Sequence, residues 1–321
     1  MNMAGMEQSG MDGVTGGQAF VPAVLLSGAS GLMGRRLRAS LAADGVPVLR
    51  LVRRAVAGPE ELRWRPTPGG GIEQARRLEG LAAAVHLSGA NVAARRWSAA
   101  WKREMWQSRV ESTRVLAEAL ARLRQRPQVL VCASAIGFYG DRAEAVLDED
   151  SARGAGFFPE LCAAWEEAAR AATEAGIRVV HLRLGVVLSR GEGALGRMLP
   201  LFRAGLGGRL GSGRQWMSWI GEVDAVRAFR FAMATSGLRG AVNAVAPEPV
   251  TNGEFTAALA RAVGRPALLP APAVALRLAF GQMADAALLA SARVVPRRLL
   301  QAGFRFEQPR LDEALREVVA G

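Results

Sequence analysis

The sequence predicts an α/β fold, in which a Rossmann-type doubly wound parallel sheet is followed by a smaller C-terminal α+β lobe. Three observations predict it. Hydrophobic residues make up 50% of the 321 positions, which is enough to bury a large core. From Ala23 onward, short apolar runs alternate with stretches of helical periodicity, as in a parallel sheet covered by helices on both faces. A glycine-rich turn, GASGLMG, joins the first apolar run to the first helical stretch.

The first elements form one βαβ unit. The apolar run AVLLSG begins at Ala23, the helical stretch RRLRASLAADG follows the glycine turn, and PVLRLV is the next strand. Further strands are expected at Ala83–Leu87, Val129–Ala133, Arg178–Leu182 and Gly240–Val245. Helices are expected at about Ala99–Leu123, Glu160–Glu174 and Val223–Thr235. In such a sheet the ligand lies at the carboxyl ends of the strands, where the strand order reverses.

The chain divides into three parts. Residues 1–20 are rich in glycine, methionine and polar residues, which predicts a disordered leader that takes no part in the fold. Residues 21–248 are expected to form the Rossmann domain, with an insertion at about 190–220. Residues 249–321 combine helical segments, proline-rich breaks and a short β-like piece, GFRFEQP, which predicts the smaller lobe.

Composition argues against several classes of protein. The formal net charge is +12, but the arginines are spread along the chain and Lys102 is the only lysine. Nucleic-acid binding requires basic residues clustered on one face or a recognisable reading module, so no nucleic-acid partner is expected. No apolar run approaches the roughly 20 residues that span a bilayer, so no membrane partner is expected. The expected location is the cytoplasm.

Cysteine and histidine are too few for a metal site or a catalytic triad. Cys132 and Cys162 lie in apolar surroundings without metal-ligand spacing, which indicates reduced, packed thiols. His86 and His181 each lie within an apolar run, which is typical of core histidines. No metal is therefore expected.

The glycine turn is a candidate nucleotide site. Its GxxGxxG pattern follows a strand and opens a helix, where glycines let backbone N–H groups approach a pyrophosphate. An ordinary glycine-rich turn is the alternative, but the position at the first strand–helix turn favours the nucleotide. The expected contacts are Gly28, Ser30, Gly31, Leu32, Met33 and Gly34.

The second strand ends in Arg53 and Arg54, where a protein that prefers NAD would carry an acidic residue. Two guanidinium groups suit a 2′-phosphate, so NADP is the expected cofactor, although arginine-rich composition is an alternative cause. The loop after the strand at 83–87 has small residues that let a cofactor pass close by. Its expected contacts are Leu87, Ser88, Gly89 and Ala90.

Several motifs together indicate a family. GASGLMG, HLSGANV, CASAIGFYGD, LRLGVVLS, GSGRQWMSWI and NAVAPEPVTN occur in this order, and the similarity extends from about Val21 to the C-terminus. With these motifs the chain resembles the atypical extended short-chain dehydrogenase/reductases of the NAD-dependent epimerase/dehydratase type. The resemblance implies an NADP-binding Rossmann core and a C-terminal substrate lobe, without a defined substrate. It also implies cofactor contacts at Ala133, Gly185 and Val186.

The chain departs from this family in its acid–base residues. Extended members use a Tyr-x-x-x-Lys pair, in which the lysine lowers the pKa of the tyrosine and holds the nicotinamide ribose. This chain has one tyrosine, Tyr139, and one lysine, Lys102, so the pair cannot exist. Leu161 and Trp165 stand at the matching positions.

Three other residues are candidates for catalysis. Ser134 matches the strand-end serine of the family and is placed to polarise a carbonyl, with a turn or helix cap as the alternative. Tyr139 closes the SAIGFYGD loop as a candidate acid, with packing as the alternative. Glu166 is a candidate replacement base, with a solvated surface carboxylate as the alternative.

Substrate contacts are expected from two segments. Arg96 and Lys102 flank a pair of tryptophans at the start of the long helix, where Ser98 is the expected N-cap and where packing in the core is the alternative for the tryptophans. The segment GSGRQWMSW matches the substrate-side stretch of the family and supplies Arg214, Gln215 and Trp219. Asp224 is expected to cap the next helix.

These observations predict an NADP(H)-binding oxidoreductase or epimerase that acts on a small polar substrate, an anionic one included. The alternative is a non-catalytic NADP(H) sensor or scaffold that kept the pocket and lost the acid–base pair. A small-molecule substrate is the expected partner, and assembly into a homodimer is left open.

Overall fold

The structure, a computed structural model, describes residues 23–320. The expected leader at residues 1–20 lies outside the described residues. Within the described part of the chain, no helix combines the length and the apolar character needed to cross a membrane. Cys132 and Cys162 are both buried and free, as expected.

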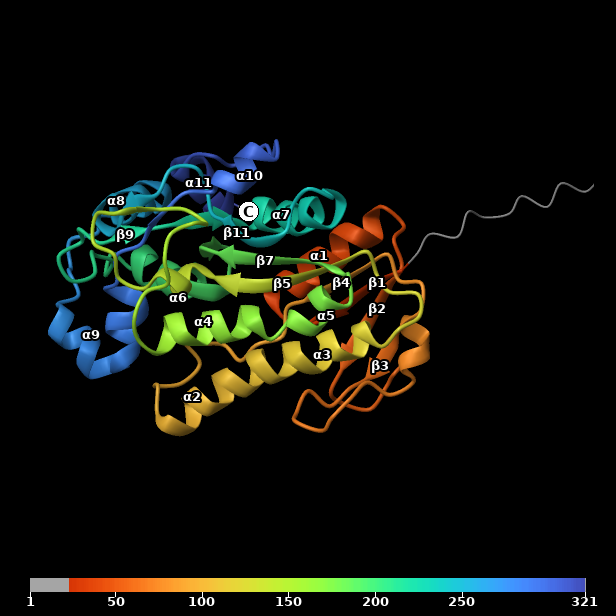
Figure 1. The fold of residues 1–321 in the computed structure, drawn as a ribbon. Coiled ribbons are helices and arrows are strands. Elements are labelled where there is room, and N and C mark those ends of the chain that lie inside the picture. Colours follow the sequence, from red (N-terminus) through yellow and green to blue (C-terminus); the bar gives the residue numbers. More distant parts are fainter. Residues whose placement is uncertain (1–22, 321) are drawn as a thin grey trace, which may run out of the picture.

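A seven-stranded sheet forms the centre of the molecule (Figure 1). Its order is β11-β7-β5-β4-β1-β2-β3, and every neighbouring pair is parallel. The strands are β1 (Val24–Ser27), β2 (Val48–Val52), β3 (Glu61–Arg63), β4 (Ala83–His86), β5 (Val129–Ala135), β7 (Arg178–Leu184) and β11 (Gly240–Ala244). The chain runs outward from β1 to β3 on one side and from β4 to β11 on the other. The order therefore reverses between β1 and β4, which confirms the doubly wound Rossmann-type prediction.

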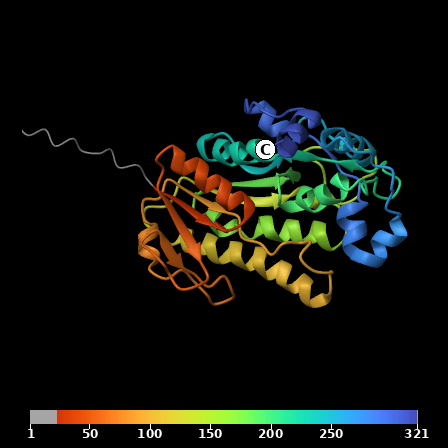
Figure 2. The ribbon, with the colours of Figure 1, turned by 180° about the vertical axis from the view of Figure 1, so that it is seen from behind.

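Helices cover both faces of the sheet (Figures 1 and 2). Helices α1 (Leu32–Ala43) and α7 (Glu222–Ala234) pack against each other on one face. The opposite face carries α2 (Ala99–Trp106), α3 (Ser112–Ala121), α4 (Phe157–Glu167) and α5 (Arg170–Glu174). Leu37 of α1 and Phe229 of α7 are fully buried in the core, because the apolar positions of each helix recur with helical spacing on the sheet side.

The long helix expected at Ala99–Leu123 is interrupted by a π-helical turn, η2 (Gln107–Glu111), between α2 and α3. Ser98 caps the start of α2, because its hydroxyl accepts the backbone N–H of Trp101 at 3.1 Å. A π turn inserts one extra residue into the helical repeat and re-aims the side chains within it. In this case it turns Arg109 inward, where the side chain is buried.

The segment after β7 builds a second, smaller core. Buried residues of α6 (Gly193–Arg203), α8 (Asn252–Val263) and α11 (Leu311–Ala320) share one apolar cluster. The shorter elements are η1 (Ala75–Leu78), η3 (Ile136–Tyr139), β6 (Val146–Leu147), β8 (Val186–Leu188), β9 (Trp216–Met217), β10 (Trp219–Gly221), β12 (Val250–Thr251), α9 (Ala273–Phe280), η4 (Ala284–Leu288), β13 (Arg293–Val294) and α10 (Arg297–Gln301). The pairing of β13 with β6 attaches the C-terminal part to the segment after β5.

Two expectations for this region are wrong. The piece GFRFEQP does not form a strand. Phe304 packs edge-on against Phe231 and Phe306, and the backbone N–H groups of Glu307 and Gln308 donate hydrogen bonds to a side chain instead of to a neighbouring strand. That side chain belongs to Asp224, which does not cap α7. Gly221 holds the N-cap position, and the buried Asp224 carboxylate accepts the backbone N–H groups of Glu307 at 2.9 Å and Gln308 at 2.8 Å.

We predict that Asp224→Ala destabilises the fold by about 2–4 kcal/mol, because it leaves one buried and one part-buried N–H group without their acceptor and removes one of the acceptors of Arg227. Urea denaturation monitored by circular dichroism measures the loss. Asp312→Ala is the matched control, since it removes a carboxylate from an exposed ion pair with Arg261 and is expected to cost less than about 1 kcal/mol. Equal losses in the two variants would contradict this role of Asp224.

Candidate functional site

The glycine turn fits tightly between two neighbouring segments at the point where the strand order reverses. Gly28 has a φ of +70°, and a Cβ atom there would lie 2.6 Å from the Leu87 carbonyl carbon. A Cβ atom at Gly34 would lie 2.2 Å from the Gly28 carbonyl oxygen. Both positions therefore require glycine, and the loop, α1 and the segment after β4 approach one another at backbone distance.

The start of α1 presents unpaired backbone donors. Gly31 is the N-cap residue and offers no side-chain hydrogen bond to the first turn, so the first N–H groups of the helix stay available for an anion. Ser30 and Gly31 are exposed, and Leu32 and Met33 are half-buried. All four expected contacts thus lie at this helix end.

Arg109 lies directly beneath the loop after β4, although no sequence motif marks it. Its Nη2 donates to the Ala90 carbonyl oxygen at 2.9 Å, and a Cβ atom at Gly89 would come within 3.1 Å of its guanidinium carbon. Its guanidinium stacks 5.1 Å from the Trp165 ring centre, its buried Nε has no partner among the described residues, and burial lowers its pKa to about 10. Ser88 and Ala90 are half-buried in the same loop. An arginine on the same helix face as the apolar Met105 and Leu116 is the signal that could have identified it.

The two arginines after β2 differ in their contacts with the rest of the protein. Arg53 is exposed, whereas Arg54 forms a bidentate ion pair with Glu61 of β3, at 2.6 and 2.8 Å. Together with the backbone N–H of Ala57, Arg54 lowers the pKa of Glu61 to about 2. Arg54 is therefore held by Glu61 although its side chain is 57% exposed, and Arg53 is exposed without an ion pair to another residue in the described part of the chain.

A cluster of three polar residues lies between β5, α4 and β7. The Ser134 hydroxyl donates to Glu166 Oε1 at 2.7 Å. Arg183 donates to both oxygens of Glu166, from Nε and Nη2, each at 2.8 Å. The side chains of Arg183 and Glu166 are only 5% and 13% exposed, so this ion pair is largely shielded from solvent. Glu166 is therefore neither a solvated surface carboxylate nor an isolated base.

Tyr139 is fully buried, and protein groups satisfy its hydroxyl on both sides. It donates to Asn243 Oδ1 at 2.7 Å and accepts from Arg183 Nη1 at 3.0 Å. Burial raises the pKa of this phenol, which opposes a role as a base. The packing alternative for Tyr139 therefore fits the structure better than the catalytic one.

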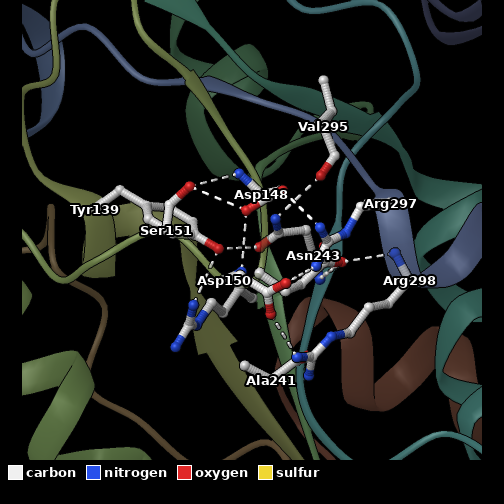
Figure 3. A network of polar contacts seen from close by, with 11 residues as sticks. Tyr139, Asp148, Asp150, Ser151, Ala241, Asn243, Val295, Arg297 and Arg298 are labelled. Atoms are coloured by element: carbon white, nitrogen blue, oxygen red, sulfur yellow. Dashed lines mark hydrogen bonds and ion pairs between the residues drawn. The ribbon is translucent and has the colours of Figure 1, made fainter.

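Asn243 links Tyr139 to the C-terminal part of the chain (Figure 3). Its side chain donates to the Val295 carbonyl oxygen at 3.1 Å, and its backbone N–H donates to Glu149. Beside it, ion pairs join the acidic segment 148–150 to Arg297 and Arg298 at the start of α10. This network fixes the segments that follow β5 and β11.

A cavity of about 310 Å³ lies at the carboxyl ends of β5 and β7, and we call it the apolar cavity. It begins one residue after Ser134, and Gly185 and Val186 form part of its wall. Its lining residues come from segments far apart in the sequence: Val92, Ala135, Ile136, Gly137, Gly140, Phe158, Leu184, Gly185, Val186, Leu188, Ala194, Leu195, Met198, Leu210, Trp216, Met217, Ser218, Asn252, Phe255, Ala286, Ala287, Leu288, Ala290 and Ala292. Ala133, the third contact implied with Gly185 and Val186, is buried within β5.

None of the five expected substrate residues lines this cavity. Gln215 is buried and donates to the Leu210 and Leu288 carbonyl oxygens at 3.0 and 3.2 Å, and the fully buried Trp219 donates to the Glu248 carbonyl oxygen. These two side chains serve the fold. Arg96 bonds to the Leu278 carbonyl oxygen, Lys102 lies over the Phe157 ring, and Arg214 is exposed.

A second groove, of about 410 Å³, lies between α8 and α11. Its charged side chains pair with one another, as Arg261 does with Asp312 and Arg310 with Glu313. Four of its charged side chains are thus already paired within the protein.

Two family descriptions match the chain. Residues 24–244 match the NAD dependent epimerase/dehydratase family, and residues 271–318 match a domain of unknown function (DUF1731). An epimerase family protein of Mycobacterium tuberculosis (strain CDC 1551 / Oshkosh) is 49% identical over 292 residues, covering 91% of this chain and 96% of that protein. The epimerase family protein SDR39U1 of Homo sapiens is 37% identical over 300 residues, covering 92% and 99%.

Solved structures show the same similarity. The crystal structure of human SDR39U1 (isoform2) with NADPH has a TM-score of 0.85 and 34% identity, covering 93% of this chain and 99% of that one. A nucleoside-diphosphate sugar epimerase from Corynebacterium glutamicum has a TM-score of 0.76 and 32% identity, covering 93% and 59%. The resemblance seen in the sequence motifs is confirmed. The chain belongs to the NAD-dependent epimerase/dehydratase family.

Proposed function

We propose that this protein binds NADP(H) and acts as an oxidoreductase or epimerase in which Ser134 and Glu166 handle the proton. The observation that carries the proposal is the 2.7 Å hydrogen bond from Ser134 to Glu166 at the end of β5, one residue before the apolar cavity begins. This hydroxyl–carboxylate pair occupies the strand-end position at which the family places its catalytic serine.

The residues at the strand-order reversal fit a dinucleotide. Gly28 and Gly34 leave room for backbone approach, and the free N–H groups after Gly31 suit a pyrophosphate. Exposed Arg53 suits a 2′-phosphate, and Arg109 holds the loop after β4 in place from below. The human relative crystallised with NADPH supports this choice of cofactor. When bound, the nicotinamide supplies or accepts a hydride.

Ser134 and Glu166 together replace the missing Tyr-x-x-x-Lys pair. In the oxidation direction, Ser134 takes the hydroxyl proton of the substrate while its own proton passes to the Glu166 carboxylate. The reverse transfers deliver a proton to the substrate oxygen during reduction. Arg183 positions Glu166 through two hydrogen bonds, so that one carboxylate oxygen stays aimed at Ser134.

A non-catalytic NADP(H) sensor is the second candidate. It is favoured by the burial of Tyr139 between Asn243 and Arg183, which removes the only phenol of the chain from the cavity. An enzyme turns over NADPH with some aldehyde or ketone in a broad screen, whereas a sensor only binds it.

We predict that NADPH binds more tightly than NADH, and that Arg53→Ala weakens NADPH binding about 10- to 100-fold while leaving NADH binding unchanged. Isothermal titration calorimetry measures both affinities. Arg265→Ala, which removes an exposed arginine just after α8, is the control. Equal affinities for the two nucleotides, or an unchanged preference in Arg53→Ala, would contradict the assignment.

We predict that Ser134→Ala lowers turnover about 10²- to 10⁴-fold without changing NADPH affinity more than about threefold, because it removes the group that passes the proton. Tyr139→Phe is expected to lower the free energy of unfolding by about 1–3 kcal/mol, since Asn243 and Arg183 each lose a buried partner, and to leave turnover close to wild type. Steady-state kinetics and thermal melts separate the two effects. If Tyr139→Phe alone abolishes turnover, the phenol is the acid and the Ser134–Glu166 assignment fails.

A further inference from the structure

We infer that the apolar cavity takes an uncharged substrate with an apolar body, such as an alkyl ketone or the corresponding alcohol, and excludes nucleotide sugars. The inference rests on the proposed function for the reacting end of the substrate, which that function places next to Ser134, the residue before Ala135 of the lining. The expectation of an uncharged, apolar substrate body rests on the residues of the cavity wall.

No charged side chain from residues 23–320 lines the cavity. Its walls are mostly alanine, leucine, valine and glycine, with Phe158 of α4, Phe255 of α8 and two flexible methionines, Met198 and Met217. Methionine adapts its shape to irregular apolar ligands. Burial of an alkyl chain against such walls contributes about 25 cal/mol for each Å² of apolar surface removed from water.

The three side chains with polar atoms in the wall, Trp216, Ser218 and Asn252, already have partners, and the Trp216 indole N–H donates to Glu144 at 2.6 Å. Ser218 Oγ donates to the Ala292 carbonyl oxygen and accepts from the Val294 N–H, both at 2.8 Å. Asn252 Oδ1 accepts the Leu210 N–H at 2.7 Å, and its Nδ2 contacts the Met217 sulfur at 3.3 Å. These groups hold the C-terminal segments together and leave the ligand a nearly apolar surface.

A nucleoside diphosphate sugar needs partners for two phosphates and several hydroxyls. The arginine expected to meet such a phosphate, Arg214, is exposed and does not line the cavity. A diphosphate in this space would lose its hydration without gaining a charged partner, which costs far more than apolar contacts return. Polar and anionic substrates are therefore disfavoured at this site, contrary to the expectation from the sequence.

The direct test is calorimetric titration of the full-length protein, saturated with NADP⁺, with 2-decanone and separately with UDP-glucose. Both the cofactor and the ketone are oxidised, so binding is measured without turnover. We expect 2-decanone to bind and UDP-glucose to give no binding heat. Binding of UDP-glucose without binding of 2-decanone would overturn the inference.

Two variants locate the binding. Met198→Glu places a charge inside the cavity and is expected to weaken 2-decanone binding at least about tenfold, while NADP⁺ affinity stays within about threefold. Leu278→Glu is the matched control, because Leu278 is 72% exposed on α9 and does not line the cavity. Equal weakening in both variants would contradict binding in the cavity. Ala287→Glu, at an exposed position of the lining, gives the same test if Met198→Glu does not fold.

The outcomes separate this inference from the proposed function. If NADP⁺ binds but 2-decanone does not, the inference is wrong and the cofactor assignment stands. If NADP⁺ does not bind, the proposed function is wrong, and repeating the 2-decanone titration on the cofactor-free protein and on Met198→Glu still tests the cavity.

Discussion

The ion pair between Glu166 and Arg183 is the contact on which the candidate site depends. It joins α4 to β7 in a largely solvent-shielded position, with two hydrogen bonds of 2.8 Å. Such a pair stabilises little by itself, because both charges lose their hydration, but loss of either partner leaves an uncompensated buried charge. The pair therefore fixes geometry: Glu166 positions Ser134 on one side, and Arg183 positions Tyr139 on the other.

Close backbone packing fixes the geometry of the candidate cofactor site, as the ion pair fixes the geometry of the polar cluster. Gly28 and Gly34 bring the first loop, α1 and the segment after β4 together without side chains between them. Arg109 supports that segment from the π turn, and its guanidinium stacks on Trp165, the residue immediately before Glu166. The cofactor loop and the Ser134–Glu166–Arg183 cluster thus share one layer of packing, which connects nucleotide binding to the placement of the carboxylate.

The parts of the fold with strong local signals could be predicted from the sequence. Apolar runs and the glycine turn predict the parallel sheet and α1, and Ser98 is recognisable as a cap. The edge strand β3 has only three residues and lacks such a signal, so its pairing of Glu61 with Arg54 could not be foreseen. Asp224 has the sequence signature of a cap, but its partners lie more than eighty residues away along the chain.

The candidate site was only partly predictable for the same reason. Ser134 and Glu166 were identified singly, and only the tertiary structure brings Arg183 between Glu166 and Tyr139. Trp219 and Gln215 lie in a segment that resembles a substrate-binding stretch, but their side chains turn into the protein interior. The wall of the apolar cavity combines segments from near residue 135 to near residue 292, so its character is set by packing and not by any one motif.

We propose that Glu166, held by Arg183, takes over proton transfer in the absence of Tyr-x-x-x-Lys. The most direct test of this role is the single-turnover rate of NADPH oxidation by Glu166→Gln, with the ketone or aldehyde that the wild-type protein reduces fastest. Glutamine keeps the shape, and its Oε1 can still accept from Ser134 and from Arg183 Nε, but its amide nitrogen cannot accept from Arg183 Nη2 and it cannot take up the proton. Because the variant also leaves the Arg183 charge unpaired, a thermal melt must first show that it is folded. We expect the single-turnover rate of NADPH oxidation to be at least about 100-fold lower than in the wild-type protein, with NADPH affinity within about threefold of wild type. An unchanged rate would show that Glu166 serves only to hold Arg183, and would contradict its role in proton transfer.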